Sequence, residues 1–189
     1  MTTISHTASE ELSAGLEQIL QSPKDAGVLE LIVRRPGVDA REPLQQGELD
    51  PKQGLVGDSW SLRKNDRAPD GLPHPDTQLN IMNARTIALI AGDRERWQLA
   101  GDQLFIDLDL SYDNLPPGTR LAIGSALVEV TAEPHRGCGK FADRFGVDAT
   151  KFVNSAVGKA HNLRGVNARV VQAGTIRVGD VVTKVQGDS

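Results

Sequence analysis

The 189-residue chain carries 21 Lys and Arg residues against 25 Asp and Glu residues, a formal net charge of −4. An acidic total disfavours general nucleic-acid binding, and no apolar run reaches the length of a membrane span. Residues 1–9 lack the basic and apolar regions of a signal peptide, and a single cysteine cannot form an internal disulfide. We therefore expect a cytoplasmic protein without membrane or nucleic-acid partners, large enough for one domain with a real core.

The first predicted element is a short amphipathic helix. Residues 7–10 have capping-box spacing, and Leu12, Leu16, Ile19 and Leu20 then repeat on one helical face until Pro23 ends the pattern. We expect residues 1–25 to form a helical appendage that docks on the body or offers a face for a homodimer. Residues 26–189 are expected to form a single domain.

Short strands and loops follow. Residues 28–35 are β-rich, residues 38–53 suggest short strands and turns, and residues 61–75 predict a long charged loop. A strand at residues 77–82 leads into a helix capped by Asn83, whose apolar face continues through Trp97 until Gly101.

The second half is also rich in strands. Residues 103–110 alternate, which predicts a strand with one polar face that includes Phe105, and Gly124-Ser125 predicts a hairpin turn. Two short helices are expected after residue 138, and further strands at residues 165–172, 175–177 and 181–185. Many short strands, glycine turns and few helices predict a mixed α/β, mainly β, barrel-like fold.

The cysteine lies in the segment EPHRGCGKF, residues 133–141. Flanking glycines leave the Cys138 thiol sterically open, and the nearby His135, Arg136 and Lys140 favour its thiolate form. A strand before and a helix after would place Cys138 at a corner where backbone N–H groups can hold an anion. The alternative is that this cysteine is a small buried hydrophobic residue.

Positive charge concentrates around this segment. Residues 134–172 contain seven Lys and Arg residues against two acids, a net of +5 within a chain of net −4. A basic segment within an acidic chain indicates a localised anionic ligand rather than a long polyanion.

An earlier motif, GLVGD at residues 54–58, predicts a tight turn. It lacks the lysine and the spacing of a phosphate-binding P-loop. Asp58 could orient a cationic group in a pocket, or it could simply cap its own turn.

Two other uses of the cysteine need further residues. His135-x-x-Cys138 has zinc-ligand spacing but requires two more ligands from His74, His161 or an acid. Cysteine-protease chemistry requires a histidine within hydrogen-bond reach of the thiol, and the sequence does not choose among His74, His135 and His161.

From Val28 onward the chain resembles a stand-alone MOSC domain, the module named after the C-terminal part of molybdenum cofactor sulfurases. The order and spacing of several motifs carry the resemblance, together with the strand near Gln78-Leu79 and the Cys138 loop. These motifs are GLVGD (54–58), LPPGTRLAIG (115–124), VEVT (128–131), RGVNARV (164–170) and GTIRVGD (174–180).

The resemblance implies coiled β-sheets that form a barrel-like core, and a bound molybdenum cofactor. Cys138 would carry sulfur as a persulfide or ligate molybdenum, since a thiolate is both a nucleophile and a soft metal ligand. The residues expected to bind the cofactor are Gly57, Asp58, His135, Arg136, Lys140, Arg164, Asn167 and Arg169.

The chain departs from the family pattern at Ser59 and Trp60, where a basic residue usually follows Asp58. It shows neither the pyridoxal-phosphate-dependent desulfurase domain of full sulfurases nor a cysteine set for an iron–sulfur cluster. Sulfur would come from a donor such as a cysteine desulfurase, or electrons from a separate reductase. Pyridoxal phosphate is not expected, because no lysine stands out as a Schiff base.

Three functions follow as hypotheses. The first is a sulfur-carrying or molybdenum-ligating role of Cys138 in cofactor sulfuration or handling. The second is a molybdenum-dependent reductase of N-hydroxylated compounds that uses an external electron donor. The third is a binding module without catalysis.

Overall fold

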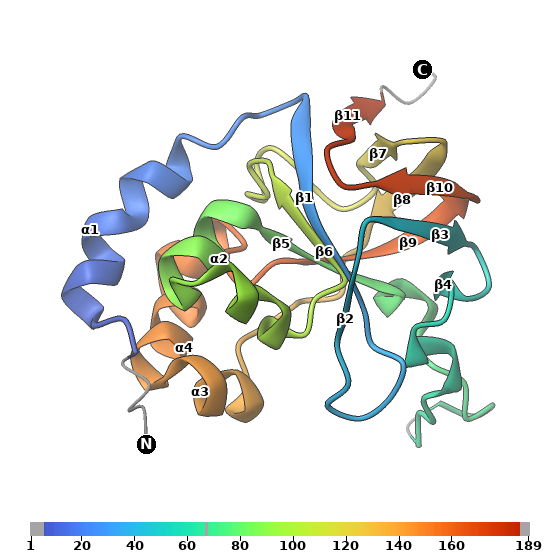
Figure 1. The fold of residues 1–189 in the computed structure, drawn as a ribbon, viewed down its shortest axis with the longest axis horizontal. Helices are drawn as coiled ribbons and strands as arrows, with labels where there is room; N and C mark the ends of the chain where they lie inside the picture. The colour runs from blue at the N-terminus through green and yellow to red at the C-terminus, as the bar shows by residue number, and fades with distance from the viewer. Residues whose placement is uncertain (1–5, 67, 186–189) are drawn as a thin grey trace.

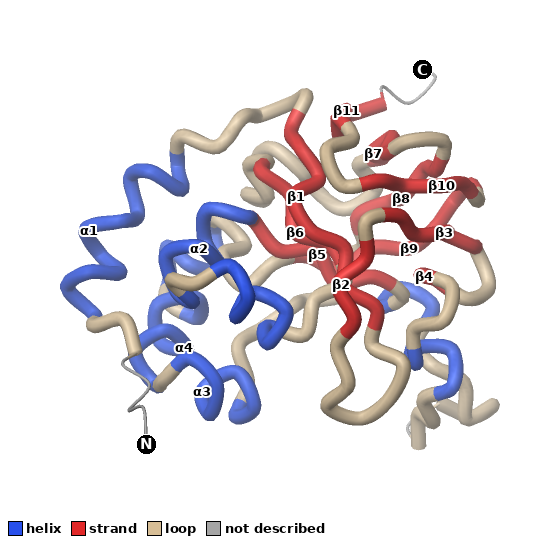
Figure 2. Tube along the Cα trace, viewed as in Figure 1, coloured by secondary structure: helices blue, strands red, loops and turns tan. Residues whose placement is uncertain are grey.

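A closed barrel of seven strands forms the centre of the protein in the computed structural model, which describes residues 6–66 and 68–185 (Figures 1 and 2). Around the barrel each strand pairs with the next, and β11 returns to β1. In that order the strands are β1 (Gly27–Arg34), β6 (Leu104–Asp107), β5 (Leu79–Asn83), β9 (Val166–Gln172), β8 (Ala126–Val130), β7 (Arg120–Ile123) and β11 (Val181–Val185). The mainly β, barrel-like fold predicted from the sequence is confirmed.

Four shorter strands extend this core. β2 (Glu42–Leu44) pairs with the end of β1. A second sheet has the order β10 (Gly174–Arg177), β3 (Gln46–Asp50) and β4 (Gly54–Leu55). The Gly124-Ser125 hairpin between β7 and β8 forms as predicted.

All barrel neighbours pair antiparallel except β5 and β6, which are parallel. Parallel neighbours need a crossover, and here α2 (Ala84–Ala91) and the 3₁₀ helix η3 (Arg94–Ala100) provide it. Asn83 begins α2 as predicted, because its side chain accepts a hydrogen bond from the Thr86 N–H. The helix then ends at Gly92, whose φ of +68° leaves the helical region, so the predicted continuation to Gly101 is wrong.

The remaining helices lie with α2 on one side of the barrel, to the left in Figure 1. They are α1 (Ser9–Leu20), α3 (Gly139–Phe145), α4 (Val147–Asn154) and α5 (Ala156–Ala160); η1 (Ser59–Leu62) and η2 (Pro75–Thr77) are short 3₁₀ turns. Three helices therefore follow Cys138 where two were predicted. Among the described residues, no helix is long and apolar enough to cross a membrane.

Two apolar clusters divide the core. The barrel interior holds residues such as Leu29, Ile81 and Ile106, and a second cluster lies between the barrel and the helices. The second cluster includes Phe105, which is fully buried with its ring centroid 6.2 Å from that of Trp97. The predicted polar face of residues 103–110 is therefore wrong at Phe105, because the helical layer covers that side of β6.

Candidate functional site

An open cavity of about 690 Å³ lies beside the barrel. Its walls come from the segment after β1, from η1 and its continuation, from the turn between η3 and β6, and from the segment that joins β8 to α3. Residues of α3, Asn80 of β5 and Arg164 before β9 complete the lining. Six cationic side chains and one carboxylate, Asp39, line the cavity. The cations are Arg35, Arg41, Arg63, Lys140, Arg144 and Arg164.

Cys138 lies on this cavity and its thiol is exposed. Its extended backbone, with φ −121° and ψ 179°, directly precedes α3. The alternative of a buried structural cysteine is therefore wrong, and the predicted strand-to-helix corner is present.

Asn154 of α4 holds the loop before the cysteine. Its side chain accepts a hydrogen bond from the Gly137 N–H at 3.1 Å and donates to the Gly137 carbonyl at 2.9 Å. A Cβ at residue 137 would lie 3.0 Å from Val153, so the glycine permits this close approach. Sequence reasoning did not single out Asn154.

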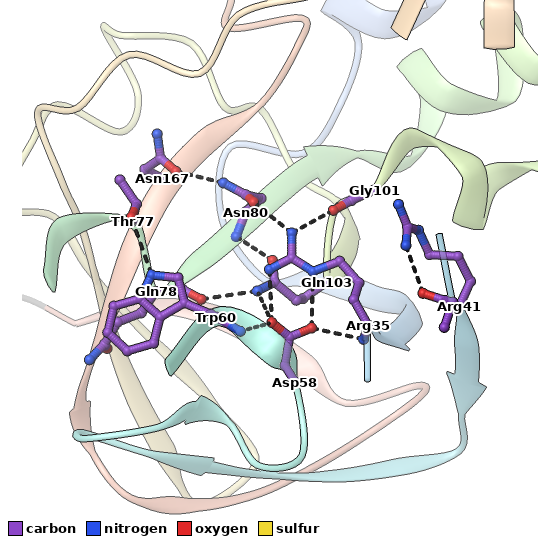
Figure 3. Close-up of polar contacts among 11 residues, drawn as sticks. Arg35, Arg41, Asp58, Trp60, Thr77, Gln78, Asn80, Gly101, Gln103 and Asn167 are labelled. Atoms are coloured by element: carbon purple, nitrogen blue, oxygen red, sulfur yellow. Dashed lines mark hydrogen bonds and ion pairs between the residues drawn. The ribbon is translucent and has the colours of Figure 1, made fainter. Parts of the chain in front are cut away.

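Arg35 and Asp58 form a buried ion pair at the edge of the cavity (Figure 3). Arg35 Nε and Nη2 donate to the two Asp58 carboxylate oxygens at 2.9 Å each, and Nη1 donates to Asn80 Oδ1 and to the Gly101 carbonyl. Burial opposes ionisation of Asp58, but Arg35 and two backbone N–H groups hold its pKa below the usual range. Asp58 also accepts from the Trp60 N–H, so it both orients a cation and caps η1.

A chain of amides continues from Arg35 into the fold (Figure 3). The Asn80 side chain donates to Asn167 Oδ1 at 2.6 Å, and its backbone N–H donates to Gln103 Oε1 at 2.7 Å. Asn167 in turn donates to the carbonyl of Glu133, at the start of the cysteine segment. Asn167 therefore acts through the backbone of that segment and does not line the cavity.

A second buried cluster joins Asp102, His135 and Arg164. One Asp102 oxygen lies 2.8 Å from His135 Nε2, and the other accepts from Arg164 Nη1 at 2.7 Å. Burial opposes ionisation of Asp102, but Arg164 and His135 hold its pKa below the usual range. Burial and the charge of Arg164 lower the pKa of His135 despite the attraction of Asp102.

The six cations fall into two groups. Arg35, Arg164 and Arg144 pair with Asp58, Asp102 and Asp39 respectively. Arg41, Arg63 and Lys140 have no carboxylate partner among residues 6–66 and 68–185.

The unpaired arginines are held in an unfavourable environment. Desolvation and the charges of Arg144 and Arg35 lower the pKa of Arg41, and desolvation and Arg35 lower the pKa of Arg63. The Arg41 Nε is also buried without a hydrogen-bond partner. An anion in the cavity would relieve this repulsion, so the arrangement is that of an anion-binding site beside an open thiol.

A family model for the MOSC domain matches residues 74–183, more than half of the chain. The chain belongs to the MOSC family. A search of the curated proteins found no match.

Solved structures support the same fold. The YuaD protein from Bacillus subtilis has a TM-score of 0.63 at 18% identity, covering 85% of this chain and 97% of that one. YiiM from Geobacillus stearothermophilus has a TM-score of 0.56 at 17% identity, covering 85% and 75%. YiiM from Escherichia coli has a TM-score of 0.54 at 19% identity, covering 86% and 71%. At these identities the comparison establishes the fold alone.

The MOSC fold brings some of the predicted site residues together and separates others. Cys138, His135, Lys140 and Arg164 line the cavity, and Asp58 lies directly behind Arg35. Gly57, with φ +83°, forms the turn beside Arg34 and before Asp58.

Two predicted residues lie elsewhere. Arg136 faces two smaller cavities, of about 80 and 270 Å³, and does not line the main one. Arg169 pairs with Glu129 and Asp76 on another part of the barrel.

Sequence reasoning missed Arg35, Arg41, Arg63 and Asp102. Arg35 is the last residue of the β-rich run at residues 28–35, which was an available signal that a charged side chain stands at a strand end. Ser59 stands at the position where relatives in the family usually have a basic residue. Arg63, four residues later, supplies a positive charge to the cavity instead.

No group of three or more His, Cys, Asp or Glu side chains lies within metal-binding distance in the described part of the chain. The His135-x-x-Cys138 spacing therefore acquires no further ligands there. At most two such side chains could reach one metal at Cys138 in that part of the chain, so the remaining ligands would come from the group that brings the metal.

Proposed function

We propose that this MOSC protein binds molybdenum cofactor in the main cavity, with the Cys138 thiolate as sulfur carrier or molybdenum ligand. The observation that carries the proposal is an exposed thiol in the same cavity as three cations that have no carboxylate partner among the residues the structure describes. The cofactor is an anionic phosphate ester that brings a thiophilic metal, and the cavity offers a partner for each part.

The residues present fit such a group. The buried, unpartnered Arg41 Nε and the lowered pKa of Arg41 and Arg63 favour a bound anion that relieves charge repulsion. A volume of about 690 Å³ is within the usual range of small-molecule sites, roughly 300–1,000 Å³. Cys138 supplies the soft ligand.

Arg41, Arg63 and Lys140 would hold the phosphate and other anionic parts, because their charges are not already neutralised. The paired Arg35 and Arg164 would keep the walls in position and lend weaker attraction. When bound, the molybdenum centre supplies two-electron redox chemistry and transfer of an oxygen or sulfur atom.

The test is metal and pterin analysis of protein purified from a host that makes molybdenum cofactor. We expect near-stoichiometric pterin in the wild type. A metal-ligand role predicts that Cys138→Ser retains pterin and molybdenum but loses one molybdenum–sulfur contact in X-ray absorption spectra. A carrier role predicts that Cys138→Ser retains both, while a persulfide-specific label modifies Cys138 only after incubation with a cysteine desulfurase and cysteine. Wild-type protein with neither pterin nor a labelled persulfide would exclude both roles.

The reductase alternative is favoured by two exposed apolar side chains at the cavity rim. Val38 is 90% exposed and Leu62 is 79% exposed, and both line the cavity. Apolar contact at the rim suits an organic substrate more than a sulfur-donor cysteine. The measurement is reduction of an N-hydroxylated base to its amine and water, with an external reductase supplying two electrons. Absence of product with loaded protein and an active reductase would leave the carrier role.

A non-catalytic module is the remaining hypothesis. It predicts that added molybdenum cofactor does not change the rate at which iodoacetamide alkylates Cys138. Our proposal predicts that cofactor bound in the cavity protects Cys138 from alkylation, because the thiol lines the same cavity.

A further inference from the structure

His135 forms a carboxylate–imidazole pair that the cofactor-binding argument does not use. It lies between β8 and α3, three residues before Cys138, and its ring lines the main cavity. Its Nε2 is 2.8 Å from Asp102 Oδ1, and the Asp102 side chain is completely buried. Arg164 binds the other oxygen of Asp102 and lies with its guanidinium 4.8 Å from the Phe141 ring centroid, which fixes the cluster.

The surroundings determine which ring nitrogen carries the proton. Burial, Arg164 and Arg35 lower the pKa of His135 below its ordinary value despite the opposing effect of Asp102, so the neutral ring is favoured at pH 7. An ionised carboxylate can only accept a hydrogen bond, so Nε2 must donate to Asp102. The Nδ1 lone pair is then free to accept a proton.

Nδ1 is also accessible. Among the described residues, Nδ1 has no hydrogen-bond partner. Three side-chain nitrogens there are buried without a partner, and Nδ1 of His135 is not one of them, so part of its surface is open to solvent. The side chain of His135 is 16% exposed. Besides the main cavity, His135 lines two smaller ones of about 80 and 270 Å³. It therefore stands at a wall shared by the ligand cavity and two other openings.

We propose that His135 is the acid–base residue of the cavity, with Asp102 as its positioning residue. Nδ1 accepts a proton from an N–H, O–H or S–H group of the bound ligand, whose bonding electron pair stays on the ligand atom. The resulting imidazolium is stabilised by Asp102 and later returns the proton. The proposal rests on the proposed function for the identity of the ligand, but the state of the ring does not depend on it.

The ring is tested first without any ligand. Long-range ¹H–¹⁵N NMR of the wild type should show His135 as the neutral form protonated on Nε2 at pH 7. Diethyl pyrocarbonate should modify its free Nδ1, as peptide mass spectrometry can locate. The substitution Asp102→Asn should reverse the tautomer of His135. The amide oxygen of the asparagine would accept from Arg164, so its NH₂ group would donate to His135 Nε2. The ring proton would then lie on Nδ1. Modification of His135 should then be lost.

The role in catalysis is tested on loaded protein. His135→Ala should retain its pterin but lose roughly 10²–10⁴-fold in turnover, and added imidazole should restore part of the loss. A purely structural role would not respond to imidazole. The matched control is His74→Gln, since His74 also lies beside a carboxylate, 3.7 Å from Glu133, but lines none of the cavities described above.

The proposal would be overturned, even if cofactor binds, by an NMR spectrum that places the ring proton of wild-type His135 on Nδ1. Failure of diethyl pyrocarbonate to modify His135 would overturn it too. Full turnover in His135→Ala would overturn it as well. If the protein binds no cofactor, the proposed function fails alone, because the NMR and modification experiments still decide the state of the ring.

Discussion

At the scale of single residues, buried carboxylates organise the site. Asp58 and Asp102 each neutralise one arginine and position a second group, the η1 turn in one case and His135 in the other. Arg35 and Arg164 are neutralised in this way and Arg144 pairs with Asp39, which leaves Arg41, Arg63 and Lys140 without a carboxylate partner in the described part of the chain. Pairing, rather than the number of positive charges, decides which side chains are free to hold an anion.

Removal of one partner of such a pair should be costly. Asp58→Ala leaves Arg35 charged and buried, so we expect a loss of about 3–5 kcal/mol in the free energy of unfolding. Urea denaturation measures this loss. Asp39→Ala, which breaks the exposed pair with Arg144, should cost only about 0–1 kcal/mol, and equal losses in the two variants would contradict the account.

The lowered pKa of His135 has a consequence for stability. At pH values between the lowered pKa of His135 in the folded protein and its value of about 6.5 in the unfolded chain, His135 binds a proton more readily in the unfolded chain than in the folded protein. The free energy of unfolding should therefore fall as the pH decreases below about 6.5. His135→Gln should flatten this dependence, measured by denaturation between pH 7 and pH 5, and an unchanged dependence in this variant would contradict the account.

Local sequence located only part of the site. The Cys138 segment was recognisable because glycines, a histidine and cations lie within a few residues of the thiol. Arg41 and Arg63 come from loops far away in sequence, and only the closure of the barrel brings them to the cavity. Asp102 comes from another distant loop and is buried against His135 and Arg164, which line the cavity. Arg169 was misplaced for the converse reason, because closeness in sequence to Arg164 does not fix the side of β9 on which a residue lies.

At the scale of elements, α1 is part of the helical layer. Leu12 and Ile19 are buried in the same cluster as Ile87 and Phe141. The apolar face that suggested a dimer contact is thus partly used within the chain, and Leu20 remains 45% exposed.

Truncation of this contact tests its contribution. Leu12→Ala should lower the free energy of unfolding by about 2–5 kcal/mol, because a fully buried side chain leaves a cavity. Leu20→Ala on the same helix should change it by less than about 0.5 kcal/mol. A neutral Leu12→Ala in thermal or urea denaturation would mean that α1 is not docked in solution.

Most strands and the capped start of α2 could be predicted, because glycine turns, alternation and Asn83 are local signals. The error at Phe105 has a tertiary cause. A barrel strand covered by helices is buried on both sides, so alternation no longer separates core from solvent.

At the scale of the whole molecule, the closed barrel connects the segments that line the main cavity. Arg35 at the end of β1, Asn80 in β5 and Asn167 in β9 join neighbouring parts of the barrel through one chain of hydrogen bonds (Figure 3). Because Asn167 also holds the carbonyl of Glu133, the barrel fixes the start of the segment that presents Cys138.

The central claim is that the unpaired cations of the main cavity bind the cofactor, and pterin content measures this most directly. The double variant Arg41→Gln/Arg63→Gln should retain less than about a tenth of the wild-type pterin, since each lost charge-assisted hydrogen bond removes about 1.5–3 kcal/mol. The control Arg136→Gln/Arg169→Gln removes the same charge outside the cavity and should retain all of it. Equal pterin in the two double variants, or loss confined to the control, would contradict the account.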